Sequence, residues 1–172
     1  SSQRIASMKG LLAQDYDAVF VGCGAPRGRD LDLPGRSEIT ENIHIGIDWL
    51  ASVSFGHVTS VGQRVIVLGG GNTAMDCCRS SLRLGAQDVK VMARKPRGFF
   101  KASAWELDDA EEESVKIVVN HAPKAFVVQD GQLRGMEFER LEYELDGDRI
   151  RSQRIVEQVT VVQLLHGDDR LL

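Results

Sequence analysis

Cysteine, proline and aromatic residues are all scarce in this chain of 172 residues, which contains three cysteines, four prolines and 6% aromatic side chains. Cys23, Cys77 and Cys78 are odd in number and lack C-x-x-C spacing, and the four histidines are scattered singly. Neither a disulfide framework nor a metal site is therefore predicted. We interpret the three cysteines as small buried thiols. Cysteines of this kind are typical of a reducing compartment, which favours a cytoplasmic location.

Long apolar runs and an excess of positive charge are also missing. No run approaches the roughly 20 apolar residues that span a bilayer, and the polar stretch SSQRIASMKG at the start lacks the apolar core of a secretion signal. The formal net charge is −4, whereas a general nucleic-acid-binding surface needs clustered positive charge. We therefore predict no membrane and no nucleic-acid partner.

Glycine is plentiful, with 17 residues, and its placement separates the predicted elements. A short strand over 17–21 runs into the turn Gly22-Cys-Gly-Ala25, and a helix is predicted over 45–55. From about Gly62 a β-α-β-α-β order follows, which is typical of a right-handed, doubly wound parallel sheet. The expected ranges are strands 65–68, 89–93 and 116–120 and helices 72–84 and 103–114.

The last third has the pattern of an antiparallel meander. Asp130-Gly131 is a two-residue turn favoured in hairpins, and Asp146-Gly147 is predicted to form a second one. The apolar residues of the middle strand change faces, which predicts a bulge near Glu139 or Arg140. The predicted fold is thus a Rossmann-like α/β sheet with a meander. Its last strands are expected over 125–128, 133–145 and 156–165, with a frayed tail over 166–172.

A glycine-rich turn lies directly between the strand at 65–68 and the helix that follows. It has the pattern G-x-G-x-x-A, which in this context predicts a dinucleotide-binding loop. Gly69 allows the tight turn, Gly71 removes a Cβ where a diphosphate would approach, and Ala74 lets the helix lie close to the strand. Amides at the positive end of the helix dipole would bind phosphate oxygens. The predicted diphosphate site comprises Gly69, Gly70, Gly71, Asn72, Thr73 and Ala74; the alternative is a tight turn without a ligand.

The basic residues after the next strand indicate which dinucleotide is bound. An NAD site usually places Asp or Glu about 20 residues after the glycine motif, where it binds the ribose hydroxyls. That position holds Arg94, followed by Lys95 and Arg97, with no acid from 89 to 100. A guanidinium pairs bidentately with a 2′-phosphate, so NADP(H) is predicted. The alternative is that these cations balance the six acids between 106 and 113.

The sequence lacks the common motifs that supply catalytic residues. No Tyr-x-x-x-Lys pair and no G-x-S-x-G motif is present, so no catalytic residue is assigned. Ser103 and Glu106 form an S-x-x-E capping box, which predicts the start of the second helix. Lys101 and Glu106 flank the predicted cofactor region, and we assign them surface and cap roles. If hydride is transferred here, a second cofactor must accept or donate it.

Three segments, 69–76, 82–86 and 91–95, resemble the NADPH-binding domain of the glutamate synthase small-subunit family, and the resemblance extends over roughly residues 15–142. It implies an FAD- and NADPH-dependent oxidoreductase in which the NADPH domain is inserted into the flavin domain. NADPH would reduce FAD, and electrons would pass through iron–sulfur centres to a partner subunit. The resemblance also implies that Arg94 and Lys95 hold the 2′-phosphate.

The chain departs from the family pattern in several places. Gly22-Cys23 stands where the family has Ala-Thr, no second G-x-G-x-x-G lies upstream, and iron–sulfur cysteine segments and a closing glycine motif after Arg149 are missing. We therefore expect a piece of a larger protein, inactive by itself, with most of the FAD site elsewhere. Residues 1–60 would be a partial flavin-domain strand, loop and linking helix, and residues 61–172 the NADP(H)-binding domain with its meander.

The expected partners are the flavin domain of the same parent chain and an iron–sulfur or large-subunit electron acceptor. Two alternatives belong to other classes. One is a non-catalytic nucleotide-sensing or interaction module that keeps the fold. The other is a self-contained dehydrogenase, which would lack an acid/base pair.

Overall fold

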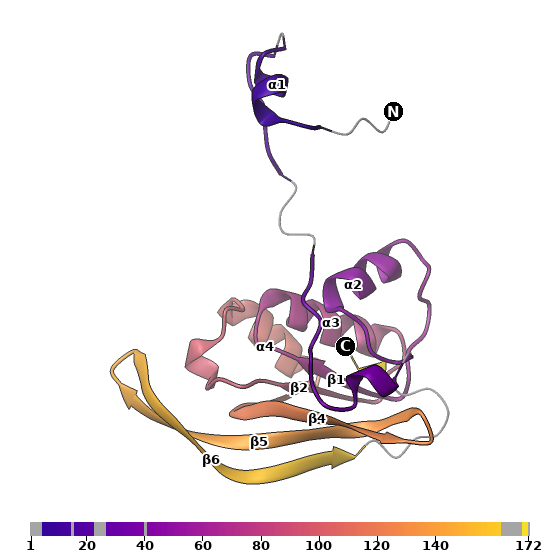
Figure 1. Ribbon diagram of the computed structural model, residues 1–172, viewed down its shortest axis with the longest axis vertical. Coiled ribbons are helices and arrows are strands. Elements are labelled where there is room, and N and C mark those ends of the chain that lie inside the picture. The colour runs from indigo at the N-terminus through magenta and orange to yellow at the C-terminus, as the bar shows by residue number, and fades with distance from the viewer. Residues whose placement is uncertain (1–4, 15, 23–26, 40, 163–169, 172) are drawn as a thin grey trace.

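The structure is a computed structural model that describes residues 5–14, 16–22, 27–39, 41–162 and 170–171. A parallel sheet lies between a layer of helices and an antiparallel sheet, with an apolar core on each of its faces (Figure 1). The predicted α/β class, a Rossmann-like parallel sheet with a meander, is confirmed. The meander, rather than a second layer of helices, covers the second face of the parallel sheet.

The parallel sheet has the strand order β3-β2-β1-β7. Val65 and Val67 of β1 contact the helices whereas Ile66 contacts the meander, because alternate residues of a strand face opposite sides. All three side chains are almost completely buried, as an apolar run covered on both faces predicts. The strands are β1 (Arg64–Leu68), β2 (Asp88–Met92), β3 (Lys116–Val118) and β7 (Arg170–Leu171).

The short strand β7 corrects the expectation of a frayed tail. Arg170 and Leu171 pair in parallel with Val65 and Ile66 of β1. Without β7, the backbone of β1 would have an unpaired edge on this side, and pairing satisfies those polar groups. The rest of the predicted tail lies outside the described residues.

Three helices cover one face of the parallel sheet: α2 (Gly46–Ser54), α3 (Asn72–Arg83) and α4 (Ala104–Glu112). Trp49 of α2 is 2% exposed and belongs to the core formed by β1, α3 and α4. Helix α3 ends before Gly85, whose φ of +101° is the left-handed conformation that glycine commonly supplies after a helix. The three helices agree with the predicted ranges to within two residues.

Cys77 and Cys78 of α3 are buried thiols, as predicted. Burial raises the pKa of Cys77 to about 12 and that of Cys78 to about 11. Since the thiolate is the reactive form, both side chains are inert packing groups at neutral pH. Cys23 lies outside the described residues.

The antiparallel sheet has the order β4-β5-β6, with β4 (His121–Gln129), β5 (Gln132–Asp146) and β6 (Arg149–Val162). Phe126, Met136 and Phe138 pack under Ile66 and Met92 of the parallel sheet. The Asp130-Gly131 turn is confirmed, with φ of +54° and +73°. The second turn is Gly147-Asp148 rather than Asp146-Gly147, because Asp146 still pairs with Arg149.

A register shift between Arg140 and Leu141 confirms the predicted bulge. The extra residue lies on the partner strand, since Glu157 pairs with Arg140 and Ile155 with Leu141, which leaves Val156 between them. The last strand, β6, also begins seven residues earlier than the predicted residue 156, at Arg149. The closed end of the β5–β6 hairpin projects beyond the rest of the body (Figure 1).

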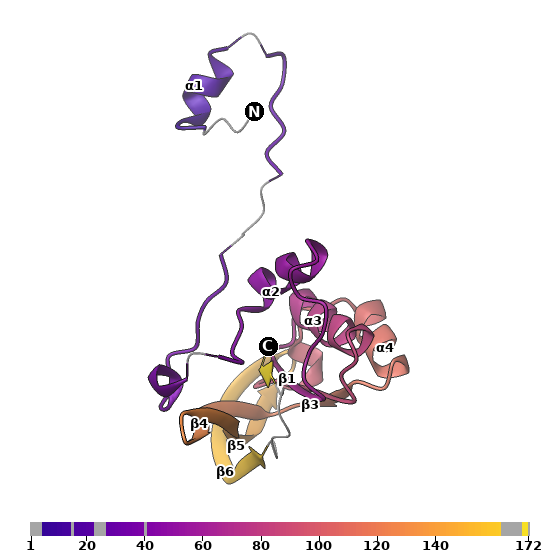
Figure 2. The ribbon, with the colours of Figure 1, turned by 90° about the vertical axis from the view of Figure 1, so that its right-hand side faces the viewer.

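The predicted strand over 17–21 is not formed. Residues 16–22 are irregular, and Phe20 and Val21 are 95% and 61% exposed. Helix α1 (Met8–Leu12), which buries no side chain, stands apart from the body in both views (Figures 1 and 2). A strand needs a neighbour for its backbone hydrogen bonds, and this segment has none among the described residues.

Candidate functional site

The three glycines after β1 differ in what their missing side chains would meet. Gly69 has a φ of +133°, a conformation that L side chains rarely adopt, and a Cβ there would lie 3.8 Å from the Cβ of Ala74. A Cβ on Gly70 would come within 2.9 Å of the Phe100 ring. A Cβ on Gly71 would meet nothing within 4 Å. The loop is therefore tightly packed on one side and open at Gly71, where a diphosphate would have to approach.

Helix α3 begins immediately after Gly71, which has no side chain to cap the first amides of the helix. Asn72 and Thr73 are exposed at this end. The Asn72 Oδ1 accepts a hydrogen bond from the Ser103 N–H at 3.1 Å, and the Gly70 carbonyl accepts one from the Lys101 N–H at 2.8 Å. The loop before α4 thus holds the glycine loop in place. The positive end of the α3 dipole therefore faces the open side of Gly71.

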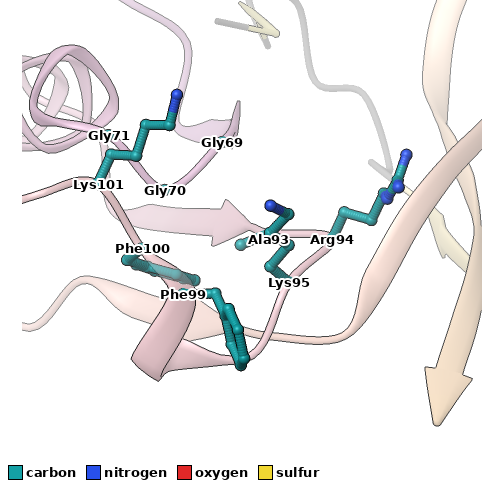
Figure 3. Close-up of a pocket in the computed structure, with 9 residues that line it drawn as sticks. All are labelled: Gly69, Gly70, Gly71, Ala93, Arg94, Lys95, Phe99, Phe100 and Lys101. Atoms are coloured by element: carbon teal, nitrogen blue, oxygen red, sulfur yellow. The ribbon is translucent and has the colours of Figure 1, made fainter. Parts of the chain in front are cut away.

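A pocket of about 250 Å³ lies between the glycine loop and the exit of β2 (Figure 3). Figure 3 shows Lys95 extending over Ala93 toward the glycine loop and Lys101 extending beside that loop, whereas Arg94 extends away from both. Both Arg94 and Lys95 are exposed, so their charges are available to a ligand. The pocket is lined by Gly69, Gly70, Gly71, Ala93, Arg94, Lys95, Phe99, Phe100 and Lys101.

Arg97 is the one predicted cation that this pocket does not include. It lies in the short helix η2 (Arg97–Phe99), and its guanidinium pairs with Glu111 of α4 at 2.8 Å and lies 3.8 Å from Asp108. The Glu111 carboxylate raises the pKa of Arg97 further above its usual value. The alternative interpretation of the basic stretch, charge balance with the acids of α4, therefore fits Arg97. The geometry gives no support to its predicted role in cofactor binding.

Ser103 and Glu106 do not form the predicted capping box. Ser103 is the residue before α4, but its side chain makes no capping hydrogen bond. Glu106 is only 8% exposed, and neither its Oε2 nor the Ser103 Oγ has a hydrogen-bond partner among the described residues. The helix start is therefore right, whereas its capping hydrogen bonds are not formed.

Phe99 and Phe100 are pocket residues that sequence reasoning missed. Lys101 is exposed, as its predicted surface role requires, and it is also a third cation at the pocket. The two phenylalanines had no assigned role. The signal that could have found them is the sequence Phe-Phe-Lys itself, because aromatic rings beside cations and a glycine loop are suited to a nucleotide.

A second pocket of about 190 Å³ lies beyond the end of β1, next to the glycine loop. It is lined by Leu68 at the end of β1, by Phe126 of β4, and by residues 29–31 and 43–46. Residues 27–39 also contact the meander: a Cβ on Gly35, whose φ is +84°, would lie 2.8 Å from the Phe126 carbonyl oxygen. The segment before α2 therefore packs tightly against the body.

The described residues contain no group of three or more His, Cys, Asp or Glu side chains placed to hold a metal ion. Among the same residues, no helix is long and apolar enough to cross a bilayer. The site thus consists of a glycine loop, a helix start and three exposed cations. These features define the class of nucleotide-binding α/β domains.

Within this class, the chain belongs to the pyridine nucleotide-disulphide oxidoreductase family, which matches residues 6–159. It is 36% identical over 132 residues to the NADPH-Fe(3+) oxidoreductase subunit beta of Geobacter sulfurreducens, covering 76% of this chain and 20% of that protein. It is 34% identical over 143 residues to the glutamate synthase (NADPH) small chain of Escherichia coli K12, covering 76% and 30%. The resemblance to the glutamate synthase small-subunit family is thereby confirmed.

Solved structures share the fold at lower identity. FprA of Mycobacterium tuberculosis in complex with NADPH matches with a TM-score of 0.67 and 17% identity, covering 94% of this chain and 50% of FprA. The thioredoxin reductase of T. acidophilum matches with a TM-score of 0.58 and 14% identity, covering 84% and 40%. This chain spans only about a fifth to a third of the curated relatives described above.

Proposed function

We propose that this chain is the NADPH-binding part of a flavin-dependent oxidoreductase. The observation that carries the proposal is the pocket that joins the open side of Gly71 to Lys95 and Lys101. A dinucleotide diphosphate would lie over the first amides of α3, where the helix dipole favours negative charge. The predicted ligands Gly69, Gly70, Gly71, Asn72, Thr73 and Ala74 all lie in this loop and helix start.

The 2′-phosphate of NADPH would bind at the exit of β2. Arg94 and Lys95 lie at this exit and Lys101 lies beside the glycine loop, and none of the described residues that line the pocket is a carboxylate that could accept the ribose hydroxyls of NADH. The ring of Phe100, packed against Gly70, supplies an apolar wall. The other half of the coenzyme would extend past the end of β1 toward the second pocket, at Leu68 and Phe126.

Hydride would pass from NADPH to an FAD held mostly by residues outside this chain. The relatives are subunits several times longer than the matched segment, which supports a flavin domain elsewhere in a longer protein. Residues 1–60 would contribute a loop, a linking helix and a segment at 17–21 that would become a strand only beside strands of that domain, and residues 61–172 would contribute the nucleotide site. Electrons would continue to an iron–sulfur or large-subunit acceptor, and the chain alone would oxidise no NADPH. We further propose that the protein works in the cytoplasm.

Coenzyme titrations with charge-removing variants test this proposal. Arg94→Ala, Lys95→Ala and Lys101→Ala should each weaken NADPH binding by about 10- to 150-fold, the scale of one charged hydrogen bond, with little effect on NADH. Arg97→Ala is the matched control, since Glu111 already holds this guanidinium, and its NADPH affinity should be unchanged. Equal affinity of the wild type for NADPH and NADH would contradict the proposal.

An absorbance assay separates the enzyme from a nucleotide-sensing module. The chain alone should bind NADPH without oxidising it, and the longer protein should bleach its yellow flavin on addition of NADPH. A longer protein that binds NADPH but holds no flavin would favour the sensing module instead.

A further inference from the structure

The backbone of Arg94 is tied to the meander by a tyrosine. The Tyr143 hydroxyl on β5 donates a hydrogen bond to the Arg94 carbonyl oxygen at 2.5 Å. The ladder of the parallel sheet ends at Met92, and the next residue, Ala93, still donates its N–H to the Val118 carbonyl and accepts from the His121 N–H. Tyr143 therefore holds the second residue beyond β2, directly before Lys95.

We propose that Tyr143 is a positioning residue that sets the preference for NADPH over NADH. It acts through the backbone of Arg94 and Lys95. This inference rests on the proposed function, because it assigns Tyr143 the task of holding the segment that would bind the 2′-phosphate. Its physical basis is preorganisation: exposed cations on a fixed backbone lose less conformational freedom when they bind a phosphate.

The position of Tyr143 is itself fixed by the hairpin. Beyond Arg140, β5 no longer pairs with β4, and β6 is its one partner among the described strands. The bulge at Val156 lies at this point, and bulges bend and twist a hairpin. The Leu141 N–H then donates to the Asn120 carbonyl at 2.7 Å, and Leu141 is buried. These contacts direct this face of the hairpin toward the exit of β2.

Charged pairs across the hairpin flank Tyr143 on both sides along β5. Glu142 pairs with Arg154, and Glu144 pairs with Arg151 and accepts a hydrogen bond from the Ser152 hydroxyl at 2.9 Å. Since residues of a strand alternate, these pairs occupy the face opposite Tyr143. They hold β5 and β6 together where the hairpin leaves the three-stranded sheet. Tyr143 therefore lies on a hairpin whose two strands are joined by side-chain ion pairs as well as by the backbone.

The test uses the two tyrosines of the chain as a matched pair. Tyr143→Phe keeps the ring and removes the hydroxyl, whereas Tyr16→Phe makes the same change at a side chain that is 58% exposed. The measurement uses the longer protein that includes the proposed flavin domain. In it, Tyr143→Phe should lower the ratio of the NADH to the NADPH dissociation constant three- to tenfold. Tyr16→Phe should leave this ratio unchanged.

Other outcomes overturn the inference. If Tyr143→Phe weakens NADPH and NADH equally, or leaves both affinities unchanged, Tyr143 is only a packing residue. If in the same assay Lys95→Ala abolishes the preference for NADPH while Tyr143→Phe does not alter it, the proposed function stands and this inference fails. If the wild type has no preference for NADPH, both fail.

A spectroscopic readout keeps the inference testable even if Tyr143→Phe folds poorly. The chain has two tyrosines, so incorporation of 3-fluorotyrosine gives two ¹⁹F signals, which the single variants assign. Addition of 2′,5′-ADP, which carries the 2′-phosphate, should shift the Tyr143 signal, and 5′-AMP should shift it much less. A Tyr143 signal that responds equally to both nucleotides, or to neither, contradicts the coupling.

Discussion

Gly70 and Gly71 are neighbours in the chain but differ in what surrounds their missing side chains. A Cβ at Gly70 would press into the Phe100 ring, whereas Gly71 faces open space with an ordinary φ of −115°. One glycine is therefore needed for packing. The other is needed, under the proposed function, for the approach of a diphosphate.

Alanine substitutions at these two glycines should separate stability from binding. Gly70→Ala should destabilise the fold by about 1–3 kcal/mol, the usual cost of overpacking, because the Phe100 ring must move. Gly71→Ala should change the free energy of unfolding by less than about 1 kcal/mol and still weaken NADPH binding. Chemical denaturation and NADPH titration of both variants provide the measurements. Unaltered NADPH affinity in Gly71→Ala would show that the diphosphate does not lie there.

The residues of the site divide by how far local sequence determines them. Gly69 and Ala74 were predictable because a tight turn and close helix packing restrict each position to a small residue, whereas Gly71 was predicted from the space that a diphosphate would need. Lys101 was not, because its relevance depends on the loop folding back until its N–H reaches the Gly70 carbonyl. Arg97 shows the converse: its sequence position resembles that of Lys95, but the short helix η2 directs it to Glu111.

At the scale of elements, α3 and α4 are joined by an ion-pair network. Glu113, just after α4, accepts hydrogen bonds from Arg79 and Arg83 of α3 at 2.8 Å, and Arg79 also pairs with Asp109 at 3.0 Å. Two hydrogen bonds hold the pKa of Glu113 below its usual value of 4.5. The bond from Arg79 contributes most, and the bond from Arg83 adds to it. The network links the helix that begins at the site to its neighbour.

Removal of the Glu113 charge should make stability depend less on pH. The folded-state pKa is lower than the unfolded one, so this contribution is complete above pH 4.5 and is lost as the pH falls through the folded value. At pH 7, Glu113→Gln should lower Tm by about 2–4 °C, which corresponds to about 1 kcal/mol. The difference from the wild type should shrink in melts recorded below pH 4. Glu112→Gln, at an exposed neighbour, is the control; an equal effect there would contradict the assignment.

The sequence predicted most elements because apolar periodicity and turn residues act locally. Strand β1 and helix α3 fall where their patterns place them, since burial on both faces and a glycine stop need no distant information. The segment over 17–21 has equally good strand residues but lacks a neighbouring strand among the described residues. Strand β7 is the opposite case, as its pairing with β1 depends on contact between residues about 100 positions apart in the chain. Pairing of this kind cannot be inferred from local pattern.

At the scale of the whole molecule, the packed body begins near Gly28. A Cβ on Gly28 would lie 2.0 Å from the Ile45 side chain, so this glycine is in close contact with the segment before α2. The described residues before it bury no side chain, and they expose Phe20, Tyr16, Leu12 and Ile5. The free energy of folding of this body therefore comes from residues after this point.

Deletion of residues 1–26 should leave the body intact. The free energy of unfolding should change by no more than about 0.5 kcal/mol, the usual range for exposed positions, and NADPH affinity should not change. Trp49→Ala is the contrasting variant, because it empties a core position in α2 and should cost about 3–5 kcal/mol. Urea denaturation measures both. A large loss on deletion would show that the first residues pack against the body after all.

The long strand β6 forms one edge of the antiparallel sheet, and such an edge can recruit a strand from another molecule. Here arginines recur along it, at 149, 151 and 154, and those at 151 and 154 pair with carboxylates of β5. An incoming strand would have to accommodate these charges beside its own backbone. The ion pairs that join β5 and β6 thereby also disfavour fibril formation by pairing of another strand with the edge of β6.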